Sequence, residues 1–135
     1  MGAGMVRGGQ TRGSTPTDGW IMLTREIGYN IIMDTNILRE CVKANIIEWR
    51  KHALERMLQR GISREWVKQA LLRGEIIESY QDDRPFESAL FFDDNMGVIH
   101  VVASVDEKNM MAYVITAYEP DNENFLDDMK TRRQR

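Results

Sequence analysis

The chain lacks most of the signatures that identify common enzymes and membrane proteins. Its 135 residues include one cysteine, two histidines and three prolines. It has no Gly-rich loop followed by Lys, no Gly-x-Ser-x-Gly motif and no Cys/His cluster with zinc-ligand spacing. No apolar run approaches the ~20 residues that a membrane helix requires. We therefore expect no cofactor, no metal and no membrane partner.

The single cysteine, Cys41, cannot form an internal disulfide, and no apolar segment follows Arg7 and Arg12 as it would in a secretory signal. We therefore expect a cytoplasmic protein. The first part of residues 1–33 is rich in Gly, Thr, Arg and Ser, and the whole stretch shows no clear periodicity. This predicts a disordered or non-native extension. The folded domain is expected over 34–121. A polar tail, frayed or in a short helix, is expected over 122–135.

Charge is unevenly distributed along the chain. Residues 37–74 contain nine basic and four acidic residues, whereas residues 75–120 contain two basic and ten acidic ones. The first part can offer a local phosphate-binding surface. A protein that coats nucleic acid without sequence preference is disfavoured, because such proteins are usually basic and the pI of this sequence is about 5.4.

The hydrophobic pattern predicts helices first and strands afterwards. Apolar residues recur at helical spacing over 34–45, 50–60 and 63–74, with capping or stop residues at the ends. Beyond Gly74 the period changes to two, and short turn-rich links separate the periodic segments. The expected fold is α+β, with N-terminal helices packed on a four-stranded antiparallel meander. Its strands are predicted at 75–80, 86–93, 98–105 and 111–118.

Six motifs stand out along the chain. They are Ile47-Glu48-Trp49-Arg50-x-His52-Ala53-x-Glu55-Arg56-Met57, Arg60-Gly61-Ile62-Ser63, Gly74-Glu75-Ile76-Ile77-Glu78-x-Tyr80, Asp82-Asp83-Arg84-Pro85-Phe86, His100-Val101-Val102 and Ile115-Thr116-x-Tyr118-Glu119-Pro120-Asp121. Together they resemble an uncharacterised bacterial and archaeal domain-of-unknown-function family, over roughly Met33 to Arg133. That family is similar to RelE/MqsR-like toxins, and its members often occur beside a YgiT/MqsA-type zinc-finger antitoxin.

The resemblance implies a RelE-like fold of the barnase/EndoU/colicin/RelE type. It also implies a metal-independent endoribonuclease, an mRNA interferase of a type II toxin–antitoxin module. The expected partners are a zinc-finger antitoxin and mRNA or the ribosome. A homodimer is left open.

Five residues are candidates for catalysis: His52, Arg56, Arg84, His100 and Tyr118. Metal-free RNA cleavage needs a base for the 2′-hydroxyl and an acid for the 5′-oxygen, and histidine can serve as either near neutral pH. The arginines could stabilise charge on the phosphate, and the tyrosine could donate a proton or stack on a base. Structural alternatives stay open, namely a bracing or sheet-face histidine, a solvated helix arginine, a loop ion pair and an aromatic lid on the core.

Three residues are candidates for substrate binding: Glu55, Arg60 and Ser88. Glu55 and Arg60 share a helix face with His52 at steps of three and four residues. Arg60 equally suits the negative end of the helix dipole. Ser88 shares a strand face with Phe86, where a hydroxyl at the edge of the core is an alternative.

Two other functions remain open. A non-catalytic protein-interaction module of the same fold is favoured by the acidic strand region, since ribosome-dependent ribonucleases usually carry strong positive charge. A DNA-binding regulator that uses residues 63–72 as recognition helix is less favoured, because the strand region would repel DNA.

Overall fold

The computed structural model describes residues 11–12, 14–15 and 33–134. The chain divides into two compact units, Met1–Ile31 and Ile32–Arg135. In the first, β1 (Thr11–Arg12) and β2 (Ser14–Thr15) pair with each other. The prediction of an N-terminal extension over 1–33 falls almost entirely on residues outside the described ones.

Three helices form in the second unit, as the sequence predicts. The side chain of Asp34 accepts hydrogen bonds from the N–H groups of the first helical turn, and that of Ser63 does the same for the third helix. Left-handed backbone follows the first two helices at Asn45 (φ 62°) and Gly61 (φ 70°). The helices are α3 (Thr35–Lys43), α4 (Lys51–Arg60) and α5 (Arg64–Arg73).

The sheet differs from the prediction in strand number and type. It has five strands in the order β3-β7-β6-β5-β4. The last four of these form an antiparallel meander, but β3 (Ile47–Trp49) runs parallel to β7, with Ile47 opposite Ala112. The prediction of a four-stranded antiparallel sheet is therefore wrong. The strand β3 was missed because three residues are too few to show a periodic hydrophobic pattern. The other strands are β4 (Glu75–Tyr80), β5 (Ser88–Asp93), β6 (Ile99–Asp106) and β7 (Met111–Tyr118).

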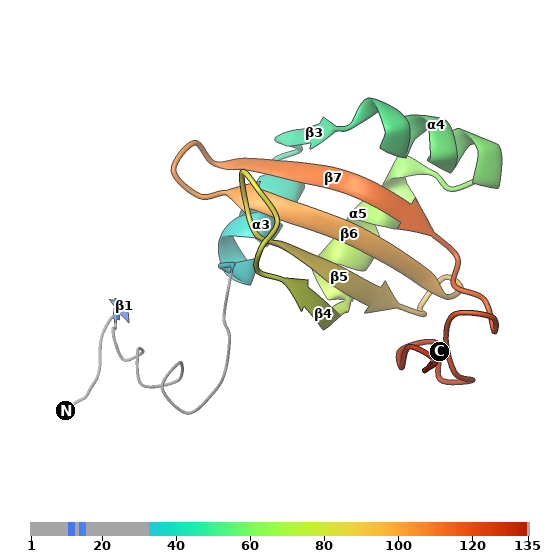
Figure 1. The fold of residues 1–135 in the computed structure, drawn as a ribbon. Coiled ribbons are helices and arrows are strands. Elements are labelled where there is room, and N and C mark those ends of the chain that lie inside the picture. Colours follow the sequence, from blue (N-terminus) through green and yellow to red (C-terminus); the bar gives the residue numbers. More distant parts are fainter. Residues whose placement is uncertain (1–10, 13, 16–32, 135) are drawn as a thin grey trace. The chain divides into compact units, whose positions relative to one another are not determined.

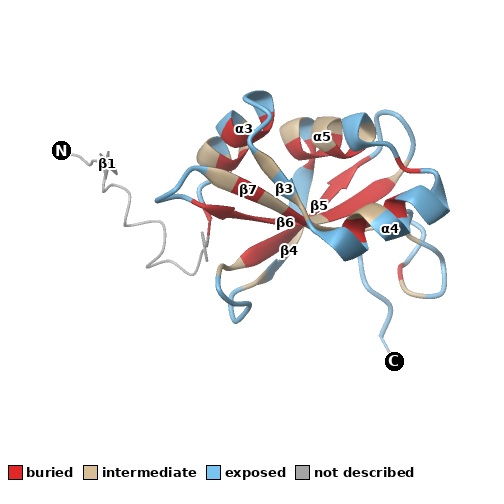
Figure 2. Ribbon diagram, turned by 90° about the horizontal axis from the view of Figure 1, so that it is seen from above, coloured by how far each residue is buried: buried red, intermediate tan, exposed pale blue. Residues whose placement is uncertain are grey.

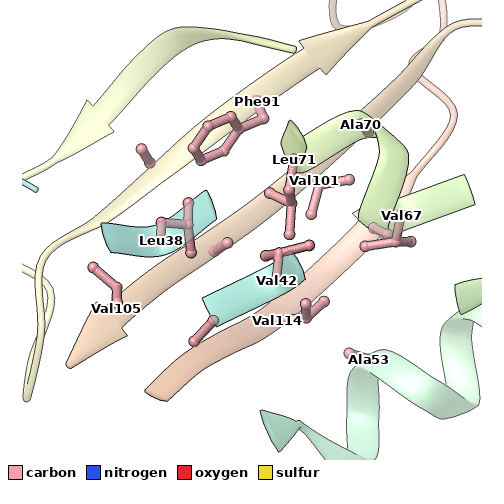
Figure 3. Packing of buried hydrophobic residues seen from close by; sticks show 14 of the residues in the cluster. Leu38, Val42, Ala53, Val67, Ala70, Leu71, Phe91, Val101, Val105 and Val114 are labelled. Carbon is pink, nitrogen blue, oxygen red and sulfur yellow. The ribbon is translucent and has the colours of Figure 1, made fainter. Parts of the chain in front are cut away.

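The main core lies between the helices and one face of the sheet. Figure 2 shows α3 and α5 on the same side of the strands. Figure 3 shows Leu38 and Val42 of α3 packed with Val101 and Val114 of the sheet, and all four are fully buried. Helix α4 lies beside β7 (Figure 1), and its buried residues Ala53 and Met57 belong to this core. Burying a Val or Leu side chain contributes about 1.5–3 kcal/mol, so this layer dominates the stability of the fold.

The opposite face of the sheet is covered in part by the C-terminal segment, residues 120–134. Phe125 is 2% exposed, and its backbone pairs with that of Arg132 in an isolated antiparallel β-bridge. The described residues of the segment form turns, bends and this bridge and no helix, which differs from the short helix that the sequence left open. It therefore adds a small second apolar layer to the domain.

Candidate functional site

A cleft of about 510 Å³ opens between the start of α4 and the loop that joins β4 to β5. Three cations and one carboxylate line it, so its charge is positive even with a neutral histidine. We call it the cationic cleft. It is lined by Arg50, Lys51 and His52 from the start of α4, by Asp83, Arg84, Pro85 and Phe86 from the loop, and by Ser104 and Ile115 from the sheet.

The first turn of α4 places basic residues at the positive end of the helix dipole. The N-cap is Arg50, whose side chain makes no capping hydrogen bond, and no acidic residue occurs in the first turn. Lys51 and His52 follow directly. A cation at a helix N-terminus costs about 0.3–1 kcal/mol, whereas an anion is stabilised there. A negatively charged group bound at this end of α4 would offset the unfavourable placement of these cations.

The parallel pairing of β3 with β7 fixes Arg50 at the mouth of the cleft. The Arg50 N–H donates to the Val114 carbonyl oxygen at 3.2 Å. Its guanidinium carbon lies 5.3 Å from the centroid of the Tyr113 ring. The Tyr113 ring also stacks on Phe86, with centroids 5.6 Å apart and 16° between the planes. One cation and two rings from three separate segments therefore form one stack.

Arg84 reaches the cleft from a loop that its own guanidinium helps to shape. Its Nη1 donates to the carbonyl oxygens of Gln81 at 3.0 Å and Asp83 at 2.8 Å. The Ser88 hydroxyl, which is fully buried, donates to the Asp83 carboxylate. Ser88 thus anchors the loop and does not line the cleft. The Arg84–Pro85 peptide is cis.

Of the candidates on α4, His52 lines the cleft, whereas Glu55, Arg56 and Arg60 do not. The His52 side chain is 89% exposed, and its Nδ1 lies 3.5 Å from Glu55 Oε1. Arg56 is exposed but does not line the cleft. Arg60 Nη1 donates to the Ala117 carbonyl oxygen at 2.9 Å and so ties the end of α4 to β7. Of the predicted site residues, the cleft itself brings together His52 and Arg84.

His100 and Tyr118 lie together at another place, beneath the C-terminal segment. His100 is fully buried, with Nδ1 3.2 Å from the Tyr118 hydroxyl and Nε2 2.6 Å from the Met129 carbonyl oxygen. Its ring packs edge-on against Phe125 at 4.6 Å between centroids. Burial lowers the pKa of His100 and raises the pKa of Tyr118. Neither residue lines the cationic cleft, so the two histidines do not share a site.

Ion pairs hold the C-terminal segment on the edge strand β4. Arg132 donates through Nε and Nη2 to the two carboxylate oxygens of Glu78, each at 3.0 Å. This pairing lowers the pKa of Glu78. Lys130 Nζ lies 2.8 Å from Glu75 Oε1. These contacts hold in place the segment that covers His100. The burial of His100 is therefore explained by the packing of the fold.

Sequence reasoning did not single out Arg50, Lys51 or the ring stack. Consecutive cations at the start of a predicted helix, with no acidic residue in its first turn, were the available signal for Arg50 and Lys51. The stack of Phe86 on Tyr113 had no local signal, because it joins residues far apart in the chain.

The same loop also lines a second cleft, of about 450 Å³. It shares Arg84, Pro85 and Phe86 with the cationic cleft. Its charge differs, because three carboxylates face two cations. The charged residues are Arg84, Glu87, Asp106, Glu107 and Lys108. Within the described part of the chain, no group of three or more His, Cys, Asp or Glu residues could hold a metal ion.

These features define an α+β domain with a cationic cleft on its sheet. The chain belongs to the family described as Domain of unknown function (DUF4258), which matches residues 49–119. The matched region contains every residue that lines the cationic cleft. A search of curated proteins gives no match. The predicted membership of an uncharacterised family is confirmed, whereas the likeness to RelE/MqsR-like toxins stays a prediction. None of the helices among the described residues is long and apolar enough to cross a membrane.

Proposed function

We propose that the protein is a toxin-like, metal-independent endoribonuclease whose active site is the cationic cleft. One observation carries the proposal: His52, whose imidazole can accept and donate a proton, shares a cleft with the cations Arg50, Lys51 and Arg84. Metal-free cleavage of a phosphodiester needs these two kinds of group together, one for the proton and the other for the charge.

The phosphate would bind at the first turn of α4. Its negative charge offsets the unfavourable placement of Arg50 and Lys51 at the positive end of the helix dipole. Arg84 approaches from the opposite wall of the cleft. Positive charges on two walls of the cleft suit a phosphorane-like transition state, because this state carries more negative charge than the bound phosphate.

In the proposed reaction His52 takes the proton of the 2′-hydroxyl, and the 2′-oxygen attacks the adjacent phosphorus. The bond from phosphorus to the 5′-oxygen breaks, and the imidazole returns the proton to that oxygen. The products are a 2′,3′-cyclic phosphate and a 5′-hydroxyl. His100 and Tyr118 take no part, because both are held beneath the C-terminal segment.

The α+β architecture is compatible with the RelE-like fold that the sequence resembles, and mRNA, free or on the ribosome, is the proposed substrate. A zinc-finger antitoxin is the proposed partner. It would inhibit by covering the cationic cleft, where acidic side chains of the partner could replace the RNA phosphates.

A non-catalytic interaction module is the second candidate. The observation that favours it is the single imidazole in the cleft: the residues that line it include no second histidine to act as a separate acid. The cations would then bind an acidic partner without any chemistry.

Induced expression in a bacterial host tests the proposal. The unmodified protein is expected to arrest growth and deplete mRNA, and His52→Ala and Arg84→Ala are expected to abolish both effects. Gln59→Ala is the matched control, because Gln59 is exposed on α4 and does not line the cleft. A folded protein that leaves growth and mRNA unchanged would sink the nuclease and favour the interaction module. So would arrest that survives His52→Ala.

A further inference from the structure

We infer that the cationic cleft contains a subsite for an unpaired nucleobase, formed by Phe86 and the Arg50 guanidinium, two members of the cleft lining that both contact Tyr113. This inference rests on the proposed function, since it names the form of RNA that the cleft accepts: single-stranded, with at least one base turned out of any stack.

The ring stack gives the cleft a wall suited to a base. Tyr113 is the common member, since it contacts both Phe86 (5.6 Å between ring centroids) and Arg50 (5.3 Å from guanidinium carbon to centroid). Phe86 and Arg50 line the cleft, whereas Tyr113 does not. Tyr113 thus supports two flat groups that remain available to a ligand.

Both available groups bind bases in the same way. Aromatic rings and guanidinium planes stack on the face of a base, and stacking contributes about 1–3 kcal/mol per base. Phe86 is half-buried and Arg50 exposed, so neither is sealed inside the core. A ring needed only for packing would gain more from the main core, which lies on the other face of the sheet.

The loop brings base and phosphate contacts to the same wall. Phe86 follows Arg84 with only Pro85 between them, and all three line the cleft. Arg50 likewise precedes Lys51 and His52. Phe86 and Arg50 are therefore flat groups that each have a cation close by in the sequence, Arg84 and Lys51 respectively, and this combination is found in single-strand binding sites. A duplex would present its bases stacked inside, out of reach of these groups.

Binding of fluorescein-labelled ten-nucleotide RNAs tests the inference, with His52→Ala as the background so that no RNA is cleaved. Three RNAs of equal backbone length are compared: single-stranded oligo(A), the same backbone without bases, and a perfect duplex. Phe86→Leu removes the ring and keeps apolar bulk, and Phe86→Trp restores a stacking surface. Gln59→Ala is the control, because Gln59 is exposed on α4 and does not line the cleft.

Phe86→Leu is expected to weaken oligo(A) binding about tenfold and to leave binding of the base-free RNA unchanged. Phe86→Trp is expected to recover most of the oligo(A) binding that Phe86→Leu loses, and Gln59→Ala is expected to bind oligo(A) as the background protein does. Equal losses for both RNAs in Phe86→Leu, duplex binding as tight as oligo(A) binding, or no binding at all would each overturn the inference. If binding depends on the ring as expected but the unmodified protein cleaves no RNA, the nuclease proposal fails and the base subsite stands.

Discussion

Lys51→Glu should change stability and RNA binding in opposite directions. Lys51 is the first residue of α4 and lines the cationic cleft. A charge at a helix N-terminus contributes about 0.3–1 kcal/mol, unfavourable for a cation and favourable for an anion. Reversal of the charge should therefore stabilise the fold by about 1 kcal/mol.

The same change should weaken RNA binding. One unit charge about 4 Å from a phosphate contributes about 1 kcal/mol in water-like surroundings, so reversal should reduce affinity about tenfold or more. Loss of one phosphate contact should also reduce the slope of log Kd against log salt by about 0.7. Urea unfolding measures the first effect, and fluorescence anisotropy over a salt series measures the second.

Lys43→Glu is the matched control. It changes the net charge equally, but Lys43 lies in the last turn of α3, and its Nζ is 3.8 Å from Glu40 Oε2. A cation at this end is favourable, so the control should lose about 1 kcal/mol of stability and bind RNA normally. The reasoning is refuted if Lys51→Glu lowers stability, or if both variants weaken RNA binding equally.

Two further predictions concern the fold. Gly74→Ala should destabilise the protein by about 2–3 kcal/mol, because a Cβ there would lie 2.4 Å from the Ala70 oxygen and 2.6 Å from the Phe92 oxygen, both backbone atoms. Gly61→Ala should cost only about 1 kcal/mol, since its φ is +70° but nothing lies within 4 Å of the added Cβ; equal urea midpoints for the two variants would contradict this. Burial lowers the pKa of His100 below 6.5, so the unfolded chain binds this proton more readily, and stability should decrease as the pH falls below about 6.5. His100→Gln should reduce that decrease in urea midpoints, and an unchanged pH dependence would count against the role assigned to this histidine.

Much of the fold could be predicted from the sequence because its signals are local. The strands at 75–80 and 111–118 match the prediction at both ends, since period-two patterns are bounded there by Gly74, by turn residues and by Pro120. The strand β3 was missed because its pairing partner, β7, lies more than sixty residues further along the chain.

The candidate site was harder to predict than the fold. The sequence placed His52 on a helix and His100 on an apolar strand, yet both were candidates for catalysis, and the structure leaves one 89% exposed and the other fully buried. The difference depends on Phe125 and Met129, which fold back over β6 from a segment that is largely polar in sequence. Long-range contacts of this kind leave no periodic signal in a single sequence.

End-group analysis of cleaved RNA tests the central claim most directly. Purified protein is incubated with single-stranded RNA in the presence of a chelator, with and without ribosomes. The account predicts fragments that end in 2′,3′-cyclic phosphate and begin with 5′-hydroxyl. His52→Ala should produce none while still binding RNA. The absence of cleavage under both conditions, or cleavage that persists in His52→Ala, would contradict the account.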